Sequence, residues 1–390
     1  MTRTLAPTSA GARNSSRTPA RDRRVLTGYF AGLGVIMAVW GTRIPAVQES
    51  AGLGTAGLAA VLLAAAVGMV AGLHVGGRLA ESARSAQLLT GSALGLAASL
   101  ALLGTSRIPL ELAAAALLFG VAHGVLDVAL NAAAVRCQDS YGRPIMSGLH
   151  AAYSLGALGG AVVAVLVAHH SHMYVFGATA AVAIVAAIAV APATRGVGSP
   201  AAAVVRADAT QQRLPVARVW LLGLLAAACL LGEGAAADWS AVHLSGLHAS
   251  PAVAAAAYAG YSAAMAGGRL VGDRLIARCG APRVVRSGGI LAAAGLLVGV
   301  AVTDAPFALA GWAVFGLGLS VTIPSLFTAA GTGGPRAVAT VAVTGYLGLL
   351  AGPALIGALA TVTSLSAALM LPAVLAAGVA VLSHRALENR

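Results

Sequence analysis

The sequence predicts an all-α integral membrane protein whose twelve transmembrane helices form two pseudo-symmetric six-helix bundles. The first observation is the composition: hydrophobic residues make up 59% of the 390 residues, charged residues make up 9%, and the mean hydropathy is +0.88. This composition leaves too little polar material to cover a soluble protein. The second observation is that apolar runs of about 20 residues, enough to cross roughly 30 Å of hydrocarbon, recur along the chain. The runs are too long and too little alternating for barrel strands, so we expect helices.

The apolar runs fall into two sets of six, and a polar segment separates the sets. The first set is predicted at 25–46, 54–76, 86–104, 109–136, 147–168 and 173–192. The second set is predicted at 219–239, 251–271, 284–303, 306–331, 337–360 and 366–383. The N-terminal segment holds six Arg among small and polar residues, which is typical of disorder. The expected domains are therefore a disordered basic tail at 1–24, a first bundle at 25–192, a cytoplasmic linker at 193–218, a second bundle at 219–383 and a cytoplasmic tail at 384–390.

The arginines predict the orientation in the membrane. All 24 basic residues are Arg, and 22 of them fall on one side of the predicted topology, which leaves Arg43 and Arg107 on the other. Because cytoplasmic loops collect positive charge, we expect both termini on the cytoplasmic side of the cell membrane. Topology and attraction to anionic lipids account for the net charge of +12, so no nucleic-acid partner is expected.

Short motifs recur at matching places in the two sets of spans. These pairs are Gly77-Arg78-Leu79-Ala80-Glu81 with Gly268-Arg269-Leu270-Val271-Gly272-Asp273-Arg274, Tyr153-Ser154-Leu155-Gly156 with Tyr346-Leu347-Gly348, and Phe119-Gly120 with Phe315-Gly316. An internal duplication of this kind is the expected build of a secondary transporter, with a binding site between the halves near the midplane.

The motifs resemble those of a known family. The segment Gly268–Gly280, GRLVGDRLIARCG, is similar to the signature loop of the major facilitator superfamily, and residues 77–84 resemble a degraded copy of it. Within that superfamily, Asp127-x-x-x-Asn131, Trp40-Gly41 and His150-x-x-Tyr153-Ser154-x-Gly156 resemble the fucose:proton symporter group and its uncharacterised bacterial inner-membrane relatives. The family acid in the fourth span is typically Glu, where this chain has Asp. The resemblance covers essentially the whole chain and implies the major facilitator fold and transport by alternating access.

Asp127, inside the fourth span, is the main functional candidate. His123, Asp127 and Asn131 stand at i, i+4 and i+8, so they share one helix face. A carboxylate within a bilayer costs several kcal/mol unless it faces a protein interior or a wet cavity. At about 1.5 Å per residue, Asp127 is expected near the midplane. A carboxyl group that meets water from alternate sides can bind and release a proton, so we predict a proton carrier or solute ligand; the alternative is a buried acid that only holds helices together.

Other polar side chains of the spans are predicted to share the task of Asp127. His123 can pass a proton to Asp127 or can be an ordinary interior histidine. Asn131 can bond the solute or a neighbouring helix. The further residues predicted to bind proton or solute are Glu233, Tyr153, Tyr258, Tyr261, Thr322 and Tyr346.

Two groups of residues are predicted to close the ends of the pathway. The outer gate would consist of Trp40 and Arg43 in the first span with Asp238 and Trp239 in the seventh; alternatively the charged residues reach separately into headgroups and the Trp residues are interfacial anchors. In the inner latch, Asp273 would cap a helix N-terminus or pair with an Arg of the other half, while the alternative is positive charge that only sets topology. The inner latch comprises Gly77, Arg78, Glu81, Gly268, Arg269, Asp273, Arg274 and Arg278.

The leading hypothesis is a proton-coupled transporter of a small polar solute, such as a sugar, and two other function classes stay open. Proton-driven efflux antiporters for drugs or metabolites usually carry Gly-Pro in the fifth span, where this chain has Gly159-Gly160. A membrane sensor or enzyme on a transporter scaffold would be expected to carry an added soluble domain or a nucleophile with its base. With no Lys there is no Gly-Lys phosphate motif, which argues against an ATP-driven pump. We therefore expect no enzyme activity, no cofactor and no metal site; nothing marks a dimer face, so a monomer is the working state.

Overall fold

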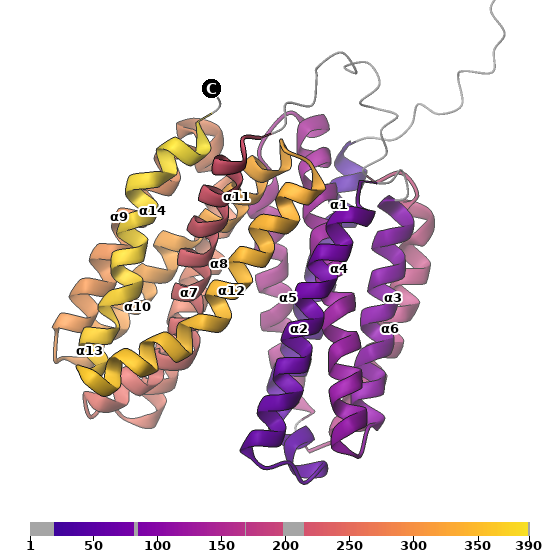
Figure 1. Ribbon diagram of the computed structural model, residues 1–390, viewed down its shortest axis with the longest axis horizontal. Coiled ribbons are helices and arrows are strands. Elements are labelled where there is room, and N and C mark those ends of the chain that lie inside the picture. Colours follow the sequence, from indigo (N-terminus) through magenta and orange to yellow (C-terminus); the bar gives the residue numbers. More distant parts are fainter. Residues whose placement is uncertain (1–18, 82–84, 168, 198–213, 389–390) are drawn as a thin grey trace, which may run out of the picture.

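The first bundle consists of helices α1 to α6. The computed structural model describes residues 19–81, 85–167, 169–197 and 214–388 of the chain. Figure 1 shows the first bundle in indigo to magenta, beside the second bundle in pink to yellow. The helices of the first bundle are α1 (Pro19–Ser50), α2 (Thr55–Leu79), α3 (Ser85–Thr105), α4 (Pro109–Tyr141), α5 (Met146–Leu166) and α6 (His172–Thr194).

The second bundle repeats the arrangement, with two of its spans interrupted. Its helices are α7 (Val216–Gly246), α8 (Pro251–Cys279), α9 (Ala281–Ala301), α10 (Ala305–Leu319), α11 (Thr322–Gly331), α12 (Pro335–Val362), α13 (Leu365–Ala368) and α14 (Met370–Leu387). The helices α10 and α11 together form one span, as do α13 and α14. Within the described residues, ten spans are long and apolar enough to cross a membrane, and α5 and α8, which are not among those ten, complete twelve. The predicted all-α fold is confirmed.

The helices extend beyond four of the predicted domain boundaries. Helix α1 begins at Pro19, so the predicted tail at 1–24 is too long at its C-terminal end; residues 1–18 lie outside the described residues. The acid Asp22 stands in the first turn, where the helix dipole favours negative charge. Helix α14 runs to Leu387, into the predicted tail at 384–390. The predicted linker at 193–218 is helical at both ends, and 198–213 lie outside the described residues.

The predicted signature loop is helical. Residues 268–279 form the last three turns of α8, and the helix ends where Gly280 takes a φ of +81°. The reason is that Leu, Arg, Ile and Ala in this segment favour a helix, while glycine readily adopts positive φ. The matching residues Gly77 and Arg78 likewise lie in α2. The motif therefore presents its side chains from a rigid helix.

Matched glycines build the two bundles in the same way. A Cβ atom on Gly156 of α5 would collide with the backbone oxygen of Ala31 on α1, and one on Gly348 of α12 would collide with that of Ala227 on α7. Small residues at these positions allow two helix backbones to approach closely. The repeated sequence motif thus corresponds to a repeated helix contact.

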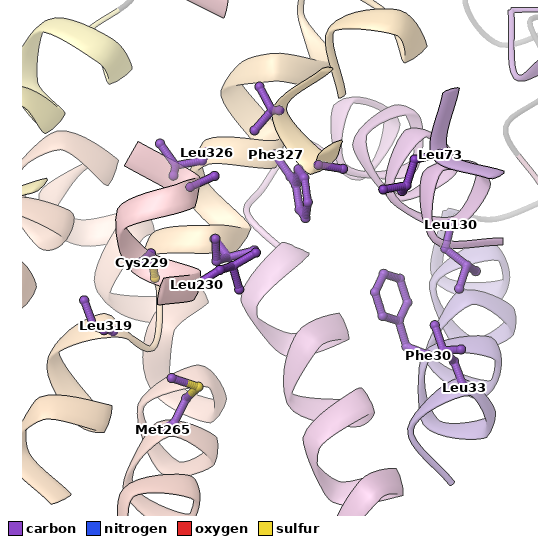
Figure 2. Packing of buried hydrophobic residues seen from close by; sticks show 14 of the residues in the cluster. Phe30, Leu33, Leu73, Leu130, Cys229, Leu230, Met265, Leu319, Leu326 and Phe327 are labelled. Atoms are coloured by element: carbon purple, nitrogen blue, oxygen red, sulfur yellow. The ribbon is translucent and has the colours of Figure 1, made fainter. Parts of the chain in front are cut away.

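The two bundles meet toward one end of the molecule. We call this the terminal end, because α1 begins there and α14 ends there; in Figure 1 the bundles lean together at this end and spread apart at the other. Buried apolar residues form a cluster that includes members of both bundles. Figure 2 shows part of it, with Phe30 of α1 and Phe327 of α11 among the labelled side chains.

Candidate functional site

The polar face of α4 lies inside the protein. His123, Asp127 and Asn131 have exposed fractions of 7%, 8% and 0%. Asn131 Nδ2 donates to Asp127 Oδ1 at 3.2 Å and to the Asp127 backbone oxygen at 2.9 Å. The second carboxyl oxygen, Oδ2, has no partner in the part of the chain that the structure describes. A buried oxygen without a partner is costly, so this atom is the natural place for a proton or a solute donor.

Tyrosines from two other helices lie near the acid. Tyr153 of α5 and Tyr346 of α12 both lie within electrostatic range of Asp127 and of Glu233 on α7. The side chains of Tyr153, Tyr346 and Glu233 are partly buried. Asp127 belongs to the first bundle and Glu233 to the second, so both tyrosines lie near acids of both bundles. Hydroxyls and carboxylates converging in an apolar surrounding can fix a polar solute.

His150, at the start of α5, was not predicted as a site residue. Its Nε2 lies 3.3 Å from Asn131 Oδ1. The imidazole ring also packs against Phe30 of α1 and Phe327 of α11, with ring centroids 5.3 and 6.1 Å apart. The available signal was its place in the His150-x-x-Tyr153-Ser154 motif, but pairing with Asn131 depends on how α4 and α5 pack.

Arg269 lies deeper than an end latch would. Its exposed fraction is 6%, whereas Arg274 and Arg278 on the same helix are exposed. The guanidinium Nη1 donates to Ser154 Oγ of the first bundle at 2.7 Å, and Nε donates to the backbone oxygen of Ser320 at 3.4 Å. Ser320 ends α10, so Arg269 ties the break between α10 and α11 to the opposite bundle. It also lies within electrostatic range of Tyr153 and Tyr346. Arg269 therefore lies beside the group formed by Asp127 and these two tyrosines, which we call the central site.

The remaining predicted binding residues lie toward the second bundle. Tyr261 is 1% exposed and packs against Phe315, with ring centroids 5.8 Å apart, so it belongs to the core. Tyr258 is 42% exposed and lies within electrostatic range of Glu233. Thr322 is fully buried at the start of α11. Among these, Tyr258 is the one most open to a solute.

Three residues of the predicted outer gate, Trp40, Arg43 and Trp239, each have a contact within their own bundle. Trp40 is buried against Phe119 and Phe176, with ring centroids 5.7 and 6.0 Å apart, which excludes the interfacial-anchor alternative for this residue. Arg43 Nη2 donates to the backbone oxygens of Ala164 and Val167, at 3.1 and 2.6 Å, and so caps the end of α5. On α7, Asp238 is exposed and Trp239 is partly buried beside Gly357. The gate itself stays a prediction.

Contacts at the terminal end join the two bundles. Asp273 accepts hydrogen bonds from the backbone N–H groups of Ser147 and Gly148, at 2.9 and 2.8 Å, so it caps the N-terminus of α5. Arg336 of α12, which was not predicted, pairs with Glu81 at 2.8 Å. Gly77 packs against Ala339 of α12, and Gly268 against Ser320 within the second bundle. Arg78 is exposed, like Arg274 and Arg278.

In the described residues no group of three His, Cys, Asp or Glu side chains is arranged to hold a metal ion. The rings of His169 and His170 lie 4.0 Å apart, at the end of the first bundle opposite the terminal end. This pair alone falls short of the donor set of a tetrahedral site.

Comparisons with known proteins match almost the whole chain. The family model described as Major Facilitator Superfamily matches residues 25–331. An uncharacterised MFS-type transporter of Yersinia pestis is 36% identical over 353 residues, covering 88% of this chain and 89% of that protein. An uncharacterised transporter of Sinorhizobium fredii is 34% identical over 376 residues, covering 93% and 98%. The solved structure of FucP, the E. coli fucose:proton symporter, in the outward conformation has a TM-score of 0.72 at 15% identity, with coverage of 96% and 100%.

Proposed function

Because the chain belongs to the major facilitator superfamily, we propose that it is a secondary transporter that couples the movement of a small polar solute to protons. The observation that carries this proposal is Asp127, an acid buried in a membrane span with one carboxyl oxygen unpartnered among the described residues. Intramembrane acids of this kind mark ion or substrate pathways. The nearby tyrosines, together with Glu233 on α7, supply the hydrogen-bonding groups for the solute.

The conformation supports alternating access. Asp273 and Arg336 hold the bundles together at the terminal end, while Figure 1 shows the bundles spreading apart at the other end. With both termini in the cytoplasm, as the arginine distribution favours, this is an outward-facing state of a protein in the bacterial inner membrane. Rocking of the two bundles about the central site would then expose Asp127 to the opposite side.

The solute class can be found by a binding screen. Purified protein would be heated with sugars, sugar acids and nucleosides, because a ligand that binds only the folded state raises the melting temperature. The best ligand would then be offered to proteoliposomes, with and without an inward proton gradient. Gradient-stimulated uptake by the native protein supports the proposal, and uptake that ignores the gradient contradicts proton coupling.

One observation favours acidic solutes within this screen. Arg269 is buried in the membrane span, and within the described residues no carboxylate lies within ion-pairing distance of it. A buried guanidinium gains most from a bidentate carboxylate. We therefore expect sugar acids to stabilise the protein more than the corresponding neutral sugars, and equal stabilisation by both would contradict this assignment.

A further inference from the structure

A chain of contacts leads from Asp127 to the surface on which the bundles meet. Asn131 Nδ2 lies 3.2 Å from Asp127 Oδ1, and Asn131 Oδ1 lies 3.3 Å from His150 Nε2. The ring of His150 stacks on Phe327 of the second bundle, with planes 26° apart. Asp127, Asn131 and Phe327 are 8%, 0% and 4% exposed. The acid is therefore linked, through the buried Asn131 and the half-buried His150, to a contact that must break when the terminal end opens.

The donor and acceptor atoms of these groups allow only one direction for the hydrogen bonds between them. The amide nitrogen of Asn131 must face Asp127, because it donates to the Asp127 backbone oxygen and because an ionised carboxylate can only accept hydrogen bonds. The amide oxygen of Asn131 then faces His150, and His150 must carry its hydrogen on Nε2 to donate to it. Each group fixes the orientation of the next one, and an ionised Asp127 adds a charge-assisted hydrogen bond at the first link.

We propose that Asn131 and His150 are positioning residues that transmit the protonation of Asp127 to the closed interface at Phe327. The inference rests on the proposed function. A hydrogen bond to an ionised group is roughly twice as strong as a neutral one, and bonds in a chain reinforce one another. When Asp127 binds a proton, the bond from Asn131 loses this strength and Asn131 holds His150 less firmly. Proton binding therefore weakens the stack on Phe327 and favours opening of the terminal end.

Charged and titratable groups from several helices face this chain. They are Tyr153 of α5, Arg269 of α8 and Tyr346 of α12, with His123 one turn from Asp127 on α4 and Glu233 of α7 near the two tyrosines. Arg269 lies within electrostatic range of His150, and Tyr153 and Tyr346 lie within range of Asp127. A pH response alone therefore does not identify the responding group, and the test must separate His150 from its neighbours by substitution.

The experiment measures the distance between the bundles at the terminal end. Spin labels would be attached through Ser140→Cys on α4 and Ser287→Cys on α9, which are both exposed, in a Cys279→Ser background that removes the exposed native thiol. Distances would be recorded on the full chain in liposomes, in acidic and in alkaline buffer. We expect a roughly five-fold higher ratio of closed to open protein in alkaline buffer, the size expected for gaining one charge-assisted hydrogen bond.

Two substitutions at His150 separate its hydrogen bond from its ring. His150→Phe keeps an aromatic ring between Phe30 and Phe327 but cannot donate to Asn131, so the pH response should disappear. His150→Gln keeps an N–H donor without the ring and should restore part of the response. The control is His74→Phe, an exposed histidine on α2, which should respond like the native protein.

A substitution in the second bundle tests the same contact independently, in case the His150 variants misfold. Phe327→Leu removes the stacking partner and should also abolish the response. A native-like response in His150→Phe and Phe327→Leu would overturn the proposal, as would a native protein whose closed fraction ignores pH while it still transports solute. If instead the labels never move and no solute is taken up, alternating access fails, and with it the proposed function.

Discussion

In the first bundle Gly120 of α4 packs against Ala65 of α2, and in the second bundle Gly316 of α10 packs against Tyr261 of α8. The interiors of these matched helices nevertheless differ in chemistry. Asp127 lies within α4, whereas the span formed by α10 and α11 contains no acidic residue and is interrupted after Leu319.

This comparison indicates that the repeated motifs keep the same helix–helix backbone contacts in both bundles, whereas the polar side chains inside the bundles differ. In the second bundle the acid near Tyr153 and Tyr346 is Glu233 on α7, so the two bundles do not offer equivalent carboxylates. In the first bundle the acid is hydrogen-bonded to Asn131, whereas in the second bundle Arg269 is held by Ser154 and by the Ser320 carbonyl. An asymmetric pair of charged groups between symmetric bundles can bind a solute in one orientation.

The largest expected effect tests whether the two acids differ in role. Asp127→Asn should abolish proton-stimulated uptake, because an amide cannot exchange the proton, while solute exchange without a gradient should persist. Glu233→Gln should weaken solute binding and retain the response to the gradient. Uptake in proteoliposomes checks both variants, with Asp139→Asn, an exposed acid at the end of the same helix α4, as the control. Equal losses of gradient response in the Asp127 and Glu233 variants would contradict the comparison.

The next effect tests whether the bundles are built alike. Gly156→Ala and Gly348→Ala each place a Cβ against a backbone oxygen of the facing helix, and overpacking of this kind costs about 1–3 kcal/mol. Both variants should therefore lower the melting temperature by similar amounts. Gly159→Ala, where a Cβ would meet open space, is the matched control on α5. A large effect at one glycine only would show that the repeated motif serves different contacts.

A smaller effect is expected where the bundles meet. Asp273→Asn replaces a charged acceptor of two backbone N–H groups, and a hydrogen bond to a charged group is worth about 1.5–3 kcal/mol. The closed terminal end should lose stability by part of that amount, which the spin-label distances would record as a larger open fraction. An unchanged open fraction would show that the cap on α5 does not hold the bundles together.

The smallest effect is expected at the exposed ion pair nearby. Arg336 and Glu81 have side chains 69% and 40% exposed, and ion pairs in water are worth about 0–1 kcal/mol. Glu81→Gln should therefore change the open fraction less than Asp273→Asn does. The same distance measurement compares the two, and the opposite order would reverse our assignment of the stronger contact.

Sequence patterns predicted several residues of the candidate site but not the contacts that those residues make with other helices. Asp127 and Asn131 could be placed on one face because a helix brings residues four apart together. His150 was visible only as part of a motif, because its bond to Asn131 joins residues from two helices. Arg269 was assigned to an end latch because the motif looked like a loop; as part of α8 it lies beside the central site instead.

The sequence by itself determined the helical spans, their division into two similar sets, and the burial of an acid in the fourth span. Hydrophobic length and helical periodicity are properties of contiguous residues, so they can be read along the chain. Only the tertiary structure decided that Asn131 pairs with His150, that Arg269 reaches Ser154, and that the terminal end is closed. These contacts join residues distant in sequence, and small rotations of packed helices select among many possible partners.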